Sequence, residues 1–515
     1  MVKEKNQLRI GVLLSYINLG ISCIIPFVYT PIMLRILGQS EYGLYSLANS
    51  VISYLTLLTF GFGSTVIRYL SKYRAEDNKE GVERTFGLFL GLYSIAALIV
   101  LIVGFFISFN VKEIFYRGLT ENEINKIHIL ILIMTFNTAL SFPLSVFSSA
   151  ITSYERYIYR KVIDMLSTIA APIFNLIALY MGFASIGMAL TSTVLQFIML
   201  PLNVGYCYKV LKILPRFGRI SSGLLREMLK FSFYAFLGTI VDLLFWSTDK
   251  VILGMLASSV AVAIYNVGGT FNNIVINLST SISGILTPRI TSMVVKNAGK
   301  ERLTELFVRV GRLQYLIIAL VISGFTVFGQ SFIYLWAGED YANSYWIAIL
   351  TMFPLCIPLI QNTGLSIVTA QNKHKFRSIV YLIIALLNVV STYLIVPIMG
   401  EIGAALCSCI SYLLGQGLIM NLYYYKVTGI NIPFFWKNIS KMSIIPGGMM
   451  IIGLIFNHYY FITEAITFLF CVIIYSVIYF IFMYIFSLNE YEKSIIKNPL
   501  QKAIRMLKVR KISRN

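Results

Sequence analysis

Charged residues are scarce in this sequence, and acidic residues are the scarcest. Asp, Glu, Lys and Arg make up only 12% of the 515 residues, whereas 57% are hydrophobic. The mean hydropathy is +0.78. Soluble domains have about 25% charged residues, and the longest polar stretches here, at roughly 20 to 30 residues, are too short for an independent fold. The composition therefore excludes a soluble protein and any sizeable soluble domain.

Residues that catalyse reactions or hold metals and nucleotides are also few or scattered. The six cysteines lie within apolar segments without a CxxC pair, and the three histidines are far apart. A metal site needs clustered ligands. The sequence also has no GxxxxGK[ST] phosphate loop and no GxSxG nucleophile elbow. We therefore predict that the protein is not an enzyme and has no cofactor and no metal.

Long apolar runs recur along the whole chain. Runs of about 20 residues can cross a bilayer as helices, and lipid cannot satisfy the backbone groups of an open chain. We therefore predict an all-α polytopic membrane protein with fourteen transmembrane helices. The predicted spans are 10–34, 44–67, 86–108, 127–151, 163–182, 186–208, 231–257, 262–288, 313–335, 345–370, 378–398, 403–425, 442–460 and 465–487.

Lys and Arg outnumber Asp and Glu by 42 to 22, and their placement predicts the topology. If the N-terminus is cytoplasmic and the loops alternate, all but five of the 42 basic residues lie in cytoplasmic segments. By the positive-inside rule, both termini are expected in the cytoplasm. The basic loops are expected to contact membrane lipids rather than nucleic acid. The five exceptions are Arg35, Lys112, Arg117, Lys126 and Lys250.

The sequence contains an internal repeat. Segment 152–160 aligns with 369–377, and the Ile-Leu-Gly of 36–38 aligns with 252–254 at nearly the same offset. Six predicted helices separate the copies, so the copies run parallel and predict two pseudo-symmetric six-helix lobes. We expect an N-lobe at 1–220, a C-lobe at 221–440, two extra helices at 441–487 and a basic cytoplasmic tail at 488–515.

Ionisable residues inside a membrane are rare and are usually functional. The predicted helix at 231–257 contains Asp242, Asp249 and Lys250. Asp242 and Asp249 are two helical turns apart, so we expect both to face one interior cavity. Lys250 either pairs with a neighbouring carboxylate or offers its charge to an anionic substrate, and the sequence leaves both interpretations open.

Cations near helix ends and amides within helices complete the predicted binding site. Arg35 and Arg68 lie at opposite ends of the first helix pair, and Arg289 is the counterpart of Arg68 in the second half. The helix at 262–288 is dense in amides and hydroxyls, which predicts a water-lined wall suited to a sugar. The predicted substrate-binding residues are Arg35, Arg68, Asp242, Asp249, Lys250, Arg289, Asn273 and Asn277.

Three segments carry a family resemblance. The first predicted helix is followed by RILGQSEYGLYSL at Arg35–Leu47, Arg68 follows FGFGS, and the helix at 231–257 ends in DKVILGML. Together with fourteen helices in two lobes, these segments resemble the polysaccharide-transporter branch of the MOP flippase superfamily, the Wzx-type flippases. The resemblance covers nearly the whole chain.

The resemblance implies a V-shaped MOP/MATE-like fold that works by alternating access. The implied activity moves an undecaprenyl-diphosphate-linked oligosaccharide across the bacterial inner membrane for O-antigen, capsule or exopolysaccharide synthesis. The helices at 442–460 and 465–487 would form a groove for the lipid tail, and a polysaccharide polymerase is a candidate partner. The alternatives are a lipid II flippase and a MATE-type cation-coupled multidrug exporter. The sequence identifies neither the glycan nor a coupling ion.

Overall fold

The protein is helical almost throughout. The computed structural model describes residues 2–218, 222–296, 299–371, 373–494 and 497, and within them it contains no β-strand. Eleven helical stretches among these residues are long and apolar enough to cross a membrane, judged by length and composition. The predicted all-α class is therefore confirmed, whereas the count of fourteen crossings stays a prediction.

Two of the eleven stretches are much longer than a bilayer is thick, and each turns at a glycine. Gly20–Ala75 has 56 residues and Lys375–Thr428 has 54, whereas about 20 residues cross a bilayer. The backbone turns at Gly38 (φ 75°, ψ 173°) and at Gly400 (φ 56°, ψ −139°). Only glycine adopts such angles readily, so one helix ends and the next begins within a single residue.

The chain forms two compact units, each built from two segments of the sequence. Unit 1 comprises Met1–Val267 and Tyr381–Ser408, and unit 2 comprises Gly268–Val380 and Cys409–Asn515. The long helices α10 (Ser259–Val295) and α14 (His374–Tyr412) therefore contribute residues to both units. The predicted lobe boundaries stay predictions.

The helices that lie wholly in unit 1 come from the first half of the chain. Short turns of 3-10 helix at Thr56–Thr59 and of π-helix at Cys207–Leu211 extend two of them. The helices wholly within unit 1 are α1 (Val2–Leu55), α2 (Phe62–Ala75), α3 (Lys79–Phe109), α4 (Val111–Phe115), α5 (Glu121–Ser153), α6 (Tyr157–Tyr180), α7 (Ala184–Tyr206), α8 (Ser222–Trp246) and α9 (Thr248–Leu256).

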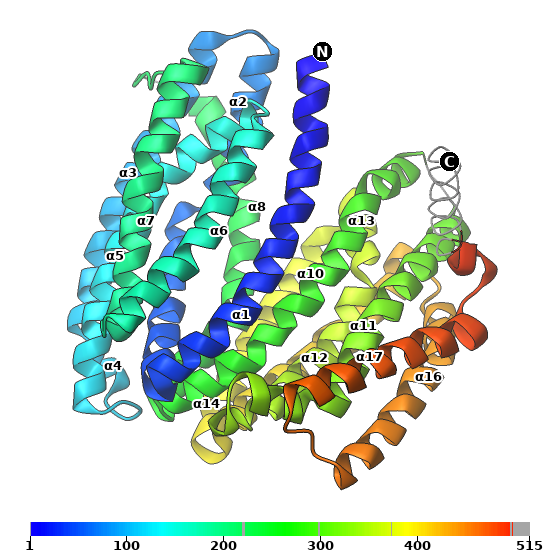
Figure 1. The fold of residues 1–515 in the computed structure, drawn as a ribbon. Helices are drawn as coiled ribbons and strands as arrows, with labels where there is room; N and C mark the ends of the chain where they lie inside the picture. The colour runs from blue at the N-terminus through cyan, green and yellow to red at the C-terminus, as the bar shows by residue number, and fades with distance from the viewer. Residues whose placement is uncertain (1, 219–221, 297–298, 372, 495–496, 498–515) are drawn as a thin grey trace, which may run out of the picture. The chain divides into compact units, whose positions relative to one another are not determined.

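Unit 1 is held together by close packing and by buried polar bonds. Helix α5 contacts α3 and α7, and α6 contacts α7 and α1 (Figure 1). A Cβ on Gly104 of α3 would lie 2.2 Å from the side chain of Thr135 in α5, so glycine permits this approach. Between α5 and α7, the Asn137 amide donates to the carbonyl of Ala189 at 3.1 Å and accepts from Thr193 at 2.6 Å.

The predicted helix at 231–257 is broken. Helix α8 ends at Trp246 and α9 begins at Thr248. Asp242 on α8 is exposed, whereas Asp249 on α9 is fully buried. The two carboxylates therefore differ in their surroundings, and the expectation that both face one cavity stays a prediction.

Unit 2 is organised around α11 (Lys300–Trp336), which contacts α12 (Ser344–Ile360), α16 (Ile432–Tyr459) and α17 (Ala465–Phe482) (Figure 1). A Cβ on Gly311 would lie 2.5 Å from the ring of Phe435, so glycine again allows α11 and α16 to meet closely. Shorter elements complete the unit: α13 (Asn362–Ala370), α15 (Asn421–Tyr423), a 3-10 turn at Glu339–Tyr341, and π turns at Leu413–Met420, Tyr424–Thr428 and Met483–Ser487.

A buried ion pair attaches the segment after the last helix to α11. Arg312 donates from Nε and Nη2 to the two carboxylate oxygens of Glu492, at 2.6 and 2.8 Å. The two side chains are only 8% and 1% exposed. Nη2 also donates to the carbonyl of Ser487 at 2.8 Å, and Glu492 accepts from the backbone N–H of Asn489 at 2.9 Å. These bonds satisfy both charges and fix residues 487–492 to α11.

Large apolar side chains are exposed on helices of both units. Phe106 and Phe109 of α3, Ile398 of α14 and Ile466 of α17 are each at least 70% exposed. Soluble monomers rarely expose apolar surface on this scale. These helix faces fit contact with lipid.

Candidate functional site

Two carboxylates, Glu41 and Glu123, hold the turn that follows Gly38. Their hydrogen-bond donors come from the N-terminal ends of α5, α7 and α10 and from α1 itself. Ser40 donates to Glu123 at 2.6 Å, Ser259 also donates to Glu123, Ser185 donates to Glu41 at 2.5 Å, and Lys126 pairs with Glu41. The second half of α1 is therefore fixed at its start to three other helices.

The segment after this turn approaches α9 and α10 closely. A Cβ on Gly43 would lie 1.8 Å from the carbonyl oxygen of Ser259, and a Cβ on Gly254 would lie 2.4 Å from the side chain of Leu47. Gly43 and Leu47 belong to RILGQSEYGLYSL, whereas Gly254 belongs to DKVILGML. Two of the segments that carry the family resemblance therefore pack against each other.

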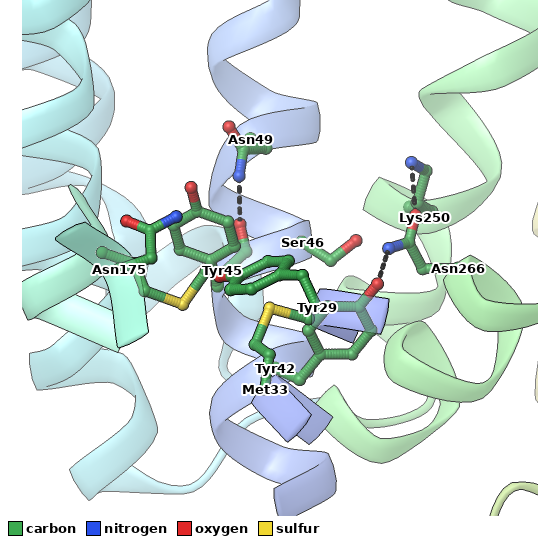
Figure 2. A pocket seen from close by; sticks show the side chains of 10 residues that line it. Tyr29, Met33, Tyr42, Tyr45, Ser46, Asn49, Asn175, Lys250 and Asn266 are labelled. Carbon is green, nitrogen blue, oxygen red and sulfur yellow. Dashed lines mark hydrogen bonds between the residues drawn. The ribbon is translucent and has the colours of Figure 1, made fainter. Parts of the chain in front are cut away.

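A polar cavity of about 300 Å³ lies within unit 1. Both halves of α1 contribute to its wall, together with α6, α7, α9 and α10 (Figure 2). Its volume is near the lower limit of small-molecule sites, which span roughly 300 to 1,000 Å³. The lining residues are Tyr29, Met33, Tyr42, Tyr45, Ser46, Asn49, Asn175, Met188, Lys250 and Asn266.

A short chain of hydrogen bonds crosses one wall of this cavity. Nζ of Lys250 donates to Oδ1 of Asn266 at 3.0 Å, and Nδ2 of Asn266 donates to the hydroxyl of Tyr42 at 2.6 Å (Figure 2). The lysine is thus bonded to a neutral amide. This geometry favours the interpretation in which Lys250 offers its charge to a substrate.

Asp249, the residue before Lys250, is directed into a different environment. Its carboxylate is fully buried and accepts hydrogen bonds from four neutral side chains of α10 and α14. The donors are Tyr265 at 2.5 Å, Ser408 at 2.7 Å, Thr392 at 3.3 Å and Asn388 at 3.4 Å. Consecutive side chains on a helix point about 100° apart, so Asp249 lies in this cluster while Lys250 lines the cavity.

Among the predicted site residues whose side chains the structure describes, Lys250 alone lies in the wall of this cavity. Arg35 on α1, Arg68 on α2 and Asp242 on α8 are exposed and do not line it. Their predicted contacts with substrate stay predictions.

The remaining predicted residues lie on the part of α10 that belongs to unit 2. Asn273 and Asn277 are exposed there, whereas their neighbour Asn272 is buried and donates to Thr351 at 3.0 Å. Arg289 lies on the same helix, but its side chain is outside the described part of the structure. Their roles in binding also stay predictions.

Sequence reasoning missed the aromatic wall of the cavity. Tyr29, Tyr42, Tyr45 and Asn175 were not predicted as site residues. The chain has 33 tyrosines, and tyrosine is common at membrane interfaces, so composition cannot single out three of them. Asn266 could have been found, because it lies on the predicted helix that is dense in amides and hydroxyls.

Comparison with known proteins identifies the family. A family model described as polysaccharide biosynthesis protein matches residues 10–294, which is more than half of the chain. The uncharacterized membrane protein EpsK of Bacillus subtilis (strain 168) is 22% identical over 425 residues, which cover 80% of this chain and 81% of EpsK. A protein of Escherichia coli (strain K12) named "Putative O-antigen transporter" is 23% identical over 418 residues, which cover 79% of this chain and 94% of that protein.

Solved structures show the fold. The inward closed conformation of the lipid II flippase MurJ aligns with a TM-score of 0.73 at 17% identity, covering 95% of this chain and 99% of MurJ. An inward-facing multidrug resistance MATE family transporter of the MOP superfamily aligns with a TM-score of 0.63 at 14% identity, covering 82% of this chain and 99% of the transporter. The chain therefore belongs to the polysaccharide biosynthesis protein family, on the membrane-transporter fold of the MOP superfamily, which confirms the resemblance predicted from its sequence.

Proposed function

We propose that this protein is a flippase for a lipid-linked oligosaccharide. It moves an undecaprenyl-diphosphate-linked repeat unit from the inner to the outer leaflet of a bacterial plasma membrane, by alternating access, for O-antigen, capsule or exopolysaccharide synthesis. The family, the name of the Escherichia coli relative and the likeness to a lipid II flippase support this proposal.

The cavity of unit 1 is the observation that carries the proposal. Its wall combines tyrosine rings with amide and hydroxyl groups and one lysine. A glycan needs many hydrogen-bond partners and apolar ring faces, whereas a hydrophobic drug would need mostly apolar walls. The amides and the cation therefore favour a polar, anionic substrate.

A second cavity, in unit 2, is suited to the lipid tail. It has a volume of about 410 Å³ and lies among α11, α12 and α16, the last of which covers the predicted extra helix at 442–460. Most of its wall is apolar. The lining residues are Tyr315, Ala319, Ile322, Ser323, Phe353, Cys356, Ile357, Ile360, Trp436, Ile439, Ser443, Pro446, Gly447 and Met450. We propose that it holds part of the prenyl chain.

Coupling to an ion gradient is proposed to use Asp249. A fully buried carboxylate within apolar helices is expensive to maintain and usually marks a functional site. Hydroxyl groups of Tyr265, Ser408 and Thr392 surround this carboxylate together with the amide nitrogen of Asn388. Carboxylate and hydroxyl oxygens are ligands that hard cations prefer, and a carboxylate can also take up a proton. A proton or a small cation bound there would neutralise Asp249 during transport.

The arrangement in the membrane is also part of the proposal. Fourteen crossings, two six-helix lobes and cytoplasmic termini in the bacterial inner membrane are supported by the positions of the basic residues. The two long stretches that turn at Gly38 and Gly400 supply the length for two crossings each. A polysaccharide polymerase is the proposed partner.

Deletion of the gene tests the function. We expect surface glycan to disappear while lipid-linked repeat units accumulate on the cytoplasmic side. Normal surface glycan in a deletion strain with no second flippase would refute the proposal. Rescue of a strain depleted of its lipid II flippase would instead support the lipid II alternative, and a raised drug resistance on overexpression would support the multidrug exporter.

A further inference from the structure

We propose that the cavity of unit 1 binds the carboxylate of an acidic sugar, such as a uronic acid, in the transported glycan. Lys250 is the counter-ion in this proposal. The inference rests on the proposed flippase function and specifies which part of the substrate this cavity recognises.

The charge of the cavity wall is the first argument. Of the ten described residues that line the cavity, Lys250 alone is charged. A lysine ammonium has three N–H donors, and the bond to Asn266 at 3.0 Å uses one of them. An anion entering the cavity therefore meets a positioned cation and no lining carboxylate that would repel it.

The neighbouring carboxylate indicates how much negative charge the site accepts. Asp249 precedes Lys250 and is fully buried among neutral donors, so the two residues together carry no net charge when both are ionised. A single carboxylate adds one negative charge to this region. A diphosphate adds at least two, and the penalty for unbalanced charge rises in a low-dielectric interior. The site therefore suits a monoanion better than the diphosphate of the lipid carrier.

The rest of the wall fits a sugar ring rather than a bare anion. Tyr29, Tyr42 and Tyr45 present aromatic rings, and Asn49 and Asn175 present amides (Figure 2). Tyrosine combines a flat apolar face with a hydroxyl, and an amide can both donate and accept hydrogen bonds. A pyranose ring needs these features for its C–H faces and its hydroxyl groups. The volume of about 300 Å³ fits a single sugar residue rather than a whole repeat unit.

Asn266 acts as a positioning residue for Lys250. Its amide oxygen accepts from the lysine while its amide nitrogen donates to Tyr42 at 2.6 Å. An ammonium can only donate, so the side of the amide that meets Lys250 is its oxygen, and the amide nitrogen is left to donate to the hydroxyl of Tyr42. This arrangement holds the ammonium at the cavity wall before substrate enters.

The experiment compares three synthetic polyprenyl-diphosphate disaccharides in proteoliposomes that contain the full chain. The terminal sugar is glucose, glucuronic acid or the methyl ester of glucuronic acid. The diphosphate and the lipid are identical in all three, and the methyl ester removes the charge without changing the protein. The rate of transfer between leaflets and the binding affinity are measured for each.

We expect the glucuronic acid analogue to bind at least roughly tenfold more tightly than the glucose analogue and the methyl ester, the size expected for a hydrogen bond to a charged group. Lys250→Gln should abolish this preference, so that the variant binds all three analogues equally. Lys250→Arg should retain it. Lys112→Gln, which neutralises an exposed cation on α4, is the matched control and should behave like the unaltered protein.

Two results would overturn the inference while leaving the flippase function intact. One is equal binding of all three analogues by the unaltered protein. The other is an equal loss for all three in Lys250→Gln, which would assign Lys250 to the shared diphosphate. If the unaltered protein neither binds nor moves any analogue, the proposed function itself fails.

Discussion

Asp249 is the residue whose surroundings are hardest to explain by packing alone. Four neutral donors converge on a carboxylate that has no exposed surface. Removing a carboxylate from water is costly unless hydrogen bonds and a nearby opposite charge compensate, and here Lys250 is the next residue along the helix. This buried, hydrogen-bonded charge is the observation behind the proposed role of Asp249 in ion coupling.

Asp249→Asn tests this role. The amide cannot carry the charge that a proton or cation would neutralise, so we expect transport driven by an imposed ion gradient to fall at least tenfold. Leaflet transfer should be measured in proteoliposomes with and without proton and sodium gradients. Asp77→Asn is the matched control, because Asp77 is exposed and has a positive φ that asparagine tolerates. A gradient response equal to that of the unaltered protein would remove Asp249 from the coupling step.

Gly43 shows how a single missing methyl group sets the position of a helix. A Cβ there would overlap the carbonyl oxygen of Ser259, because the two would be 1.8 Å apart. We expect Gly43→Ala to destabilise the protein by about 1–3 kcal/mol through forced backbone shifts. Gly91→Ala, where nothing lies within 4 Å, should be neutral or slightly stabilising. Thermal unfolding in detergent measures both, and equal melting temperatures would contradict the close contact.

At the scale of elements, the two halves of α1 depend on the backbone of Gly38. With φ 75° and ψ 173°, this residue lies in a region that is almost exclusive to glycine. Both halves of α1 line the cavity, so the angle between them shapes it.

Gly38→Ala is expected to cost about 1–3 kcal/mol of stability, the range for a strained residue. It should also weaken binding of the proposed lipid-linked substrate, because Tyr42 and Tyr45 would shift relative to Tyr29. Gly20→Ala on the same helix is the control, since nothing lies within 4 Å of the added Cβ and its φ is not positive. Melting temperature and substrate affinity are the measurements. An alanine variant at position 38 with unchanged affinity would show that the turn does not shape the cavity.

The sequence predicted the positions of the helices better than the breaks within them. The predicted spans fall mostly on helical residues, because long apolar runs respond directly to the bilayer. The break at Ser247 was missed because hydropathy measures how apolar a stretch is, not whether its backbone is continuous. Lys250 was found because a charge within an apolar run is rare. Tyr29 and Asn175 were not found, since their meeting depends on how α1 and α6 pack, which no local pattern records.

At the scale of the whole molecule, the order of segments in the sequence differs from their grouping into the two units. Residues 381–408 of α14 belong to unit 1, although the sequence on either side of them belongs to unit 2. Asn388, Thr392 and Ser408 of this segment supply three of the four donors to Asp249. The set of hydrogen-bond donors around Asp249 is therefore complete only after more than 400 residues of the chain have been synthesised.

The ion pair between Arg312 and Glu492 is a long-range contact that mutation can test. Arg312→Met or Glu492→Leu alone should destabilise unit 2 by about 3–5 kcal/mol, because each leaves a buried charge without its partner. The double variant should recover most of that loss. A double-mutant cycle of melting temperatures measures the coupling, and additive single effects would indicate that the pair does not interact.

This ion pair also decides where the chain can be shortened or joined to another protein. The last membrane helix, α17, ends at Phe482, but the folded part of unit 2 continues through Glu492. A protein cut just after α17 would expose the guanidinium of Arg312 to an apolar interior with no counter-charge. Any fluorescent or affinity fusion should therefore be attached beyond Glu492, and a protease site for removing it belongs there as well.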